Sequence, residues 1–169
     1  MRVAPSPRII SAYSFSKVYA MTGWRVGYCV APPEVAATLT RLQEPLVSCV
    51  NAPAQMGALA ALTGPQEIVG EMRDAYRQRR DAAVALLEAA SVPVLRPAGA
   101  FYLWVDITRS GRDSRDFAFS LIADQGVAVA PGTAFGAAGE GFVRISMASD
   151  LDVLLEGTRR VIAHVQARA

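Results

Sequence analysis

The chain contains a single lysine, Lys17, against 16 arginines. Arginine can replace lysine as a fixed positive charge, but only the lysine amine can lose its proton and attack a carbonyl. Ser14 and Ser16 place two hydroxyl donors just before Lys17, and Arg25 follows it by eight residues. An amine, two hydroxyls and a guanidinium in one short stretch indicate a binding site for an aldehyde that carries a phosphate. For Lys17 taken alone, a compositional bias toward arginine that left one lysine by chance is the alternative.

Four stretches of the sequence resemble one enzyme family. The segment around Lys17 contains S-F-S-K followed by A-M-T-G-W-R-V-G-Y, and the others are P-A-G-A-F-Y at 97–102, A-P-G-T-A-F at 130–135 and F-V-R-I-S at 142–146. Together they resemble class I, aspartate-aminotransferase-like enzymes, which depend on pyridoxal 5'-phosphate. Members of this family are more than twice as long, and their cofactor lysine lies past the midpoint. The resemblance therefore implies the C-terminal portion of such an enzyme.

The resemblance assigns four residues to the cofactor. Lys17 would hold pyridoxal phosphate as a Schiff base and then act as the base that moves the α-proton of the substrate. Ser14, Ser16 and Arg25 would bind the phosphate, because a guanidinium can donate to two oxygens of a dianion at once. Each residue has a structural alternative: an exposed surface position for Lys17, a turn cap for either serine, and an ion pair with a nearby carboxylate for Arg25.

Arg144 and Asn51 are the candidates for substrate binding. Arg144 lies between Val143 and Ile145 in a predicted strand, and alternation sends its side chain to the opposite face from theirs. The resemblance implies that Arg144 binds the α-carboxylate of the amino acid, and a salt bridge to an acid of the chain is the alternative. Asn51 resembles an asparagine near the start of a family helix, but a helix cap would explain it equally well.

Other groups of the family site have no candidate in this sequence. They are the aspartate that pairs with the pyridine nitrogen, the tyrosine that bonds the ring hydroxyl, and the asparagine beside it. We therefore expect this chain alone to bind the cofactor weakly and to catalyse little. Gly99, Phe101 and Tyr102 match either a family loop at the mouth of the site or a simple strand entry, and His164 is expected on the surface.

The first part of the chain predicts two strands followed by three helices. The strands are predicted over residues 8–13 and 25–30, the second of them buried on both faces. The helices are predicted over residues 34–45, 51–64 and 66–90, with Pro45 ending the first. In the second helix, Met56, Leu59 and Leu62 recur at helical spacing and predict its inward face.

The second part alternates short strands with helices. Strands are predicted over residues 92–95, 100–107, 127–130 and 142–147. One helix is predicted from an N-cap at Ser114 to a stop at Gly126, and the last begins after Asp150. These elements predict an α/β fold. The resemblance implies the type I pyridoxal-phosphate-dependent transferase fold, with the last strands of the large domain in residues 1–64 and the small domain, led by the long helix, in residues 65–169.

Composition argues against several other classes of protein. The net charge is +2, and no basic patch interleaved with aromatic residues suggests nucleic-acid binding. No apolar run approaches the roughly 18 residues that span a bilayer, and the N-terminus lacks the apolar core of a signal peptide. Cys29 and Cys49 have no metal-ligand spacing and are expected as reduced core thiols, with a chance pairing of the two as the alternative. We expect a cytoplasmic protein with no metal, membrane or nucleic-acid partner.

The reaction implied by the resemblance is amino transfer from an amino acid to a 2-oxo acid, in a family that forms homodimers. A lyase or decarboxylase of the same fold would use Lys17 and Arg144 in the same way, so these two residues do not separate the activities. A non-catalytic fragment, or the sensing domain severed from a regulator, is a third possibility, although no helix-turn-helix signal supports a regulator. The amino acid is not readable, because most residues that would meet its far end lie outside this chain.

Overall fold

The computed structural model describes residues 9–167, and the chain divides into two compact units, Met1–Glu71 (unit 1) and Met72–Ala169 (unit 2). The division falls within the long helix α4 (Glu67–Ala89). Each unit has its own cluster of buried apolar side chains. The predicted boundary between residues 64 and 65 refers to the domains of the complete family fold and stays a prediction.

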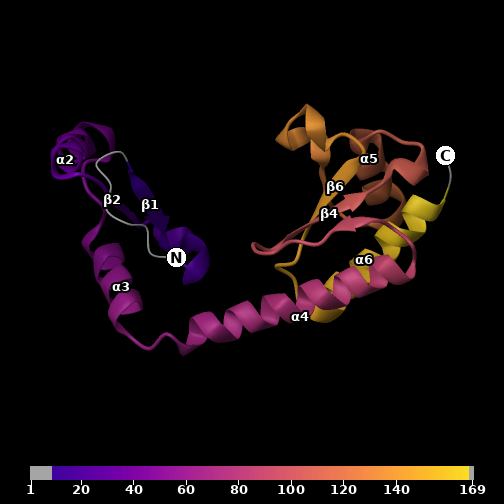
Figure 1. The fold of residues 1–169 in the computed structure, drawn as a ribbon, viewed down its shortest axis with the longest axis horizontal. Coiled ribbons are helices and arrows are strands. Elements are labelled where there is room, and N and C mark those ends of the chain that lie inside the picture. The colour runs from indigo at the N-terminus through magenta and orange to yellow at the C-terminus, as the bar shows by residue number, and fades with distance from the viewer. Residues whose placement is uncertain (1–8, 168–169) are drawn as a thin grey trace. The chain divides into compact units, whose positions relative to one another are not determined.

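Unit 1 combines a two-stranded antiparallel sheet with helices (Figure 1). Its elements in chain order are β1 (Ser11–Ser14), α1 (Phe15–Val18), the 3-10 turn η1 (Thr22–Trp24), β2 (Gly27–Val30), α2 (Pro33–Val47) and α3 (Ala52–Thr63). Both predicted strands and both predicted helices are present. The expected end of α2 at Pro45 is wrong, because the N–H of Ser48 donates to the Glu44 carbonyl oxygen at 2.9 Å and closes one more turn. A proline so near the end of a helix removes only one bond.

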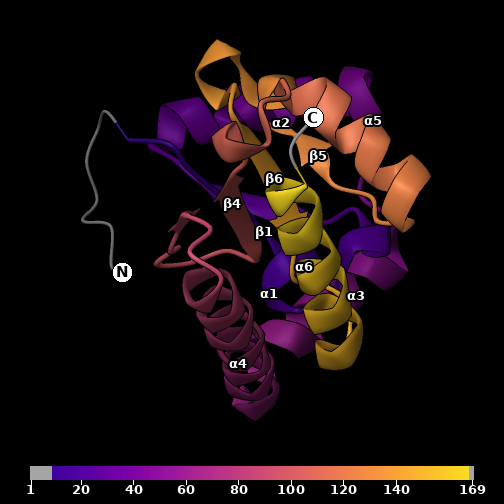
Figure 2. The ribbon, with the colours of Figure 1, turned by 90° about the vertical axis from the view of Figure 1, so that its right-hand side faces the viewer.

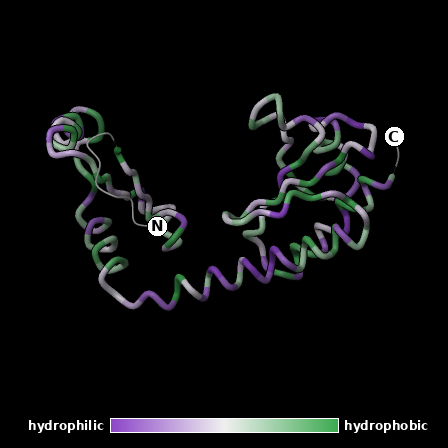
Figure 3. The backbone as a smooth tube through the Cα atoms, in the orientation of Figure 1, coloured by the Kyte–Doolittle hydropathy of each residue, from purple (hydrophilic) through white to green (hydrophobic). Residues whose placement is uncertain are grey.

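The inward face of α3 is not the one that was predicted. Met56, Leu59 and Leu62 are 64%, 53% and 49% exposed, whereas Ala54 and Ala58 are buried. Figure 3 shows that most of α3 is apolar, so its hydropathy does not single out one face. Close packing decides which face is inward. A Cβ on Gly57 would lie 2.8 Å from the Trp24 ring, so only small residues fit where α3 packs against Trp24.

Two further expectations for unit 1 are wrong. All four residues of β2 are exposed, although burial on both faces was predicted. In the described part of the chain β2 pairs only with β1, and two strands do not form a covered sheet. Cys29 in β2 and Cys49 after α2 are free thiols on the exposed surface instead of core thiols.

Unit 2 contains a four-stranded antiparallel sheet in the order β3-β4-β6-β5, which confirms the four predicted strands. The strands are β3 (Val94–Leu95), β4 (Tyr102–Asp106), β5 (Ala130–Pro131) and β6 (Phe142–Ser146), and the helices that follow β4 and β6 are α5 (Ser114–Gln125) and α6 (Leu151–Gln166). Strand β5 shares only Ala130 with the strand predicted over residues 127–130, and β3 covers only the second half of the strand predicted over residues 92–95. Figures 1 and 2 show α4 and α6 on the same side of β4 and β6.

The core of unit 2 forms between one face of this sheet and the three helices. Leu103 and Val105 of β4 and Val143 of β6 are fully buried. They share a cluster with residues of α4, α5 and α6, among them Val84, Leu87, Phe117, Leu121, Leu154 and Val161. The opposite face of the sheet carries Arg144 and is not part of this core.

Two details of the helices in unit 2 correct the sequence-based expectations. The N-cap of α5 is Asp113, whose carboxylate accepts from two backbone N–H groups, and Ser114 is the first helical residue. His164 is not on the surface: it is 3% exposed, its Nε2 lies 2.8 Å from the Ser120 hydroxyl, and its ring packs edge-on against Phe117. Across residues 9–167, no helix combines the length and the apolar character needed to cross a membrane.

Candidate functional site

The turn that carries Lys17 is anchored by its neighbours. Ser14 ends β1 and caps α1, because its Oγ accepts from the N–H of Ser16 at 3.1 Å. Phe15 is 3% exposed and its N–H donates to the Val26 carbonyl oxygen at 3.3 Å, which fixes the first residue of α1 to the chain just before β2. Lys17 is exposed on this short helix. The cap interpretation of Ser14 is therefore confirmed. The cap uses the hydroxyl oxygen as an acceptor, so the hydroxyl hydrogen of Ser14 remains available as a donor.

Thr22 links this turn to Arg25. The Thr22 hydroxyl donates to the Ser16 carbonyl oxygen at 2.9 Å, and Nη1 of Arg25 donates to the Thr22 carbonyl oxygen at 2.9 Å. Arg25 has a left-handed backbone, with φ 52° and ψ 47°, an uncommon conformation for a residue with a side chain. The sequence interpretation missed Thr22, although it belongs to the matched A-M-T-G-W-R segment. In the described part of the chain, Arg25 forms no ion pair with a carboxylate.

The strand register brings the two segments together. Ser14 stands opposite Gly27, two residues beyond Arg25. A Cβ on Gly27 would lie 2.5 Å from the carbonyl oxygen of Tyr13, so the strands can pair this closely only with glycine there. The side chains of Ser14, Ser16, Lys17 and Arg25 are all hydrogen-bond donors, and two of them are cationic. This donor set fits pyridoxal phosphate, which presents a phosphate dianion and an aldehyde.

Asn51 is the N-cap of α3. Its Oδ1 accepts from the N–H of Ala54 at 2.8 Å, so the cap interpretation is confirmed. The cap occupies the side-chain oxygen and leaves the amide NH₂ as a donor. A role for Asn51 in substrate binding stays a prediction.

Arg144 belongs to unit 2 and has the predicted orientation, since Val143 and Ile145 are buried and Arg144 is on the other face of β6. Aromatic rings surround it: Cζ lies 3.9 Å from the centre of the Tyr102 ring and 4.0 Å from that of Phe135. In residues 9–167 no acid forms an ion pair with Arg144. The sequence interpretation did not assign either ring to Arg144.

The loop that carries Phe135 is held in place by close contacts. It contains the 3-10 turns η3 (Gly132–Phe135) and η4 (Ala137–Gly139), and a Cβ on Gly132 or Gly139 would overlap the carbonyl oxygen of the other. The carboxylate of Glu140 accepts from the backbone N–H groups of Gly141 and Ser114, both at 2.8 Å. These bonds hold the pKa of Glu140 below its usual value and fix the loop to the start of α5.

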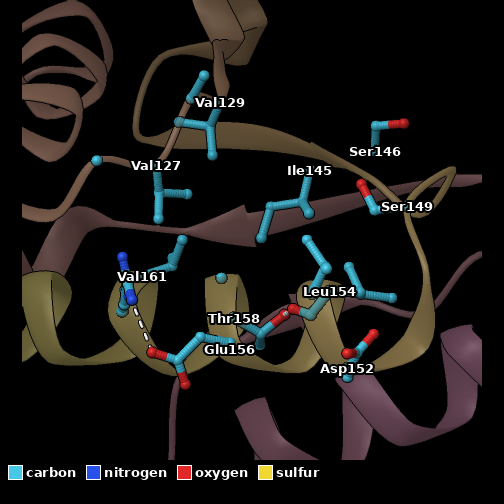
Figure 4. Close-up of a pocket in the computed structure, with 15 residues that line it drawn as sticks. Val127, Val129, Ile145, Ser146, Ser149, Asp152, Leu154, Glu156, Thr158 and Val161 are labelled. Atoms are coloured by element: carbon cyan, nitrogen blue, oxygen red, sulfur yellow. Dashed lines mark hydrogen bonds and ion pairs between the residues drawn. The ribbon is translucent and has the colours of Figure 1, made fainter.

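A cavity of about 660 Å³ lies elsewhere in unit 2 (Figure 4). Val127 and Val129 line one side, Ile145 of β6 the floor, and Leu154 of α6 the other side. None of the predicted site residues lines it, and its wall combines apolar side chains with polar and charged ones such as Asp152, Glu156 and Arg160. It is a cavity beside α6 and not the candidate site.

Residues 1–160 match the family described as aminotransferase class I and II. The chain belongs to this family. The resemblance that the sequence suggested is therefore confirmed, and the cofactor of the aminotransferase family is pyridoxal phosphate.

Curated aminotransferases resemble the chain over most of its length. It is 43% identical over 155 residues to a probable aspartate/prephenate aminotransferase of Aquifex aeolicus, covering 88% of this chain and 39% of the relative. It is 38% identical over 146 residues to a probable N-acetyl-LL-diaminopimelate aminotransferase of Bacillus subtilis, covering 86% of this chain and 37% of the relative. The chain thus spans about two fifths of the length of the relatives it matches.

Solved aminotransferase structures share the fold. An aromatic aminotransferase from Pyrococcus horikoshii superposes with a TM-score of 0.88 at 36% identity, covering 93% of this chain and 42% of that one. An aspartate aminotransferase double mutant from Thermus thermophilus gives a TM-score of 0.84 at 35% identity, covering 92% and 41%. The predicted fold class is confirmed: the chain matches the C-terminal part of the pyridoxal-phosphate-dependent aminotransferase fold.

Proposed function

We propose that the chain is part of a pyridoxal-phosphate-dependent aminotransferase that moves an amino group from an amino acid to a 2-oxo acid. The observation that carries this proposal is the position of Lys17. The only lysine of the sequence lies on a turn that Phe15 anchors and that Thr22 ties to Arg25. The amine and the second cation thus belong to one hydrogen-bonded segment, and together they offer an aldehyde a nucleophile and a phosphate a guanidinium.

Each residue has a stated task in this proposal. Ser14, Ser16 and Arg25 would bind the phosphate, and Lys17 would hold the cofactor covalently until the amine of the substrate takes its place. The Nζ amine released in this exchange would then take up the α-proton and return it. Bound pyridoxal phosphate supplies a ring that withdraws electrons from the α-carbon. Arg144 binds the α-carboxylate through its guanidinium edge and so orients the α-proton.

The names of the relatives favour amino transfer over a lyase or decarboxylase reaction. They include aspartate, LL-diaminopimelate and aromatic-amino-acid aminotransferases. These substrates share an α-carboxylate and an α-amine and differ in the side chain. We therefore propose the reaction class and leave the side chain of the amino acid open. Formation of a new amino acid from a 2-oxo acid by the intact enzyme would separate amino transfer from the two alternatives.

We also propose that the intact enzyme is a cytoplasmic homodimer without a nucleic-acid or membrane partner. Support for the dimer comes from the family, and the mixed charge and net charge of +2 give no surface for an acidic polymer. Light scattering of the intact enzyme and cell fractionation would test these points.

The test of the proposed function is covalent attachment of the cofactor. Pyridoxal phosphate is added to the chain, the visible absorbance is recorded, and the adduct is reduced with borohydride and located by peptide mass mapping. Lys17→Arg is the matched variant, because it keeps the positive charge but has no nucleophilic amine. We expect an absorbance band and a reduced adduct on Lys17 in the unaltered chain, and neither in the variant. An equal band in both chains would refute the assignment.

A further inference from the structure

Arg144 is enclosed by two aromatic rings on opposite sides. Its Cζ lies 3.9 Å from the Tyr102 ring centre and 4.0 Å from the Phe135 ring centre. The two rings make no contact with each other, although rings stacked on one side of a single guanidinium would have to touch. The guanidinium therefore lies between them. Cζ is 3.9 Å and 4.0 Å from the two ring centres, the contact distance of a ring stacked on a flat face, so we infer that both faces are covered.

A guanidinium covered on both faces can be reached only along its edge. All of its N–H donors point outward in its own plane, which is the direction from which a carboxylate accepts two parallel hydrogen bonds. Uncovered, the same side chain would sample many rotamers, and binding would have to order it. We propose that Tyr102 and Phe135 are positioning residues that hold Arg144 edge-on for the α-carboxylate. This inference rests on the proposed function of Arg144.

Each ring is also held in place by contacts with residues other than Arg144. Tyr102 is in β4, opposite Ser146, and its ring contacts Phe101 at 4.5 Å between centres. Phe135 stands at the end of η3, and its ring meets Trp104 edge-on at 5.5 Å. Phe135 is nevertheless 49% exposed, so its replacement by a smaller apolar residue leaves the core of unit 2 intact.

The experiment measures carboxylate binding by the full chain, without a need for catalysis. The chain is labelled with ¹⁵N, the Nε–H signal of Arg144 is identified by its loss in Arg144→Lys, and pyruvate is titrated as the probe. Phe135→Leu and Tyr102→Leu remove one ring each and keep an apolar side chain. We expect each to raise the dissociation constant about three- to tenfold, the ordering cost of one long side chain. Tyr102→Phe, which keeps the ring, should stay within about twofold.

A matched control uses another exposed phenylalanine beside an arginine. Phe119 is 62% exposed and stacks on Arg115 at 5.7 Å, so Phe119→Leu should leave pyruvate binding unchanged. A second readout needs no ligand: ring currents should shift the Arg144 signal upfield in the unaltered chain and less in Phe135→Leu.

The two levels of the proposal fail differently. Binding to Arg144→Lys is followed through the backbone amide signals of Val143 and Ile145, which this variant keeps. If Arg144→Lys binds pyruvate as tightly as the unaltered chain, the role of Arg144 in the proposed function is wrong. If Arg144→Lys loses binding but both leucine variants keep it, or if the Arg144 signal shows no ring-current shift, the positioning role of the rings is wrong while the proposed function stands.

Discussion

Gly27→Ala tests whether the close packing of β1 and β2 is needed for cofactor binding, because it changes that packing and leaves all the site residues in the chain. The added Cβ would lie 2.5 Å from the Tyr13 carbonyl oxygen, about 1 Å short of an ordinary contact, and backbone on both sides leaves no flexible atom to yield. Overpacking of this kind costs about 1–3 kcal/mol of unfolding free energy. For a unit of this size the melting temperature falls by roughly 5–20 °C. Because Ser14 pairs with Gly27, the strain also displaces Ser14 from Arg25.

Gly23→Ala is the matched control, because Gly23 lies in the same segment and no atom would approach its Cβ within 4 Å. Trp24 and Trp104 are the two tryptophans, one in each unit, so in a Trp104→Phe background the fluorescence of Trp24 follows unit 1 alone. We expect Gly27→Ala to lower the melting temperature and to weaken pyridoxal phosphate binding, and Gly23→Ala to do neither. Equal effects of both variants would refute the contact, and a Gly27→Ala chain that melts early but binds the cofactor normally would refute its link to the site.

Two further predictions concern stability. Burial lowers the pKa of His164, the only histidine, below its unfolded value of about 6.5. Between that value and the folded pKa the unfolded state binds more protons, so the unfolding free energy should fall on acidification by at most about 1.4 kcal/mol per pH unit. In urea titrations at several pH values, His164→Gln should lack this dependence. Gly70→Ala in α4 should raise the unfolding free energy by about 0.5–1 kcal/mol, because there is open space around its Cβ. Gly57→Ala should raise the unfolding free energy less, or lower it, because its Cβ would press against the Trp24 ring. Equal gains in thermal unfolding would contradict that contact.

The sequence predicted the orientation of β6 in unit 2 correctly, because alternation inside the strand decides its inward face. Val143 and Ile145 alternate with Arg144, and the sheet has a complete core on one side, so alternation alone orients the arginine correctly. The stop of α5 at Gly126 was equally local, since a left-handed residue ends the helix. Features that depend on one element are the ones that a single sequence can give.

Predictions failed where a distant contact decided the outcome. Helix α3 has apolar residues all round, and Trp24, which is 33 residues before Gly57, determines that its small residues face inward. His164 follows the pattern of a surface residue near a helix end, but the Ser120 hydroxyl gives it a buried partner 44 residues away. Periodicity identifies which residues are apolar or polar but not which of them meet.

The same distinction applies to the candidate site. The residues that could react were found from their chemistry, whereas the residues that position them have no chemistry of their own. Thr22 connects Lys17's turn to Arg25 with one hydroxyl and one carbonyl, and Phe135 reaches Arg144 only because Gly132 and Gly139 let two turns pack closely. Both lie inside segments that match the family. The residues in such a motif that cannot react are therefore the first to test as positioning residues, because only the contacts of the folded chain give them a function.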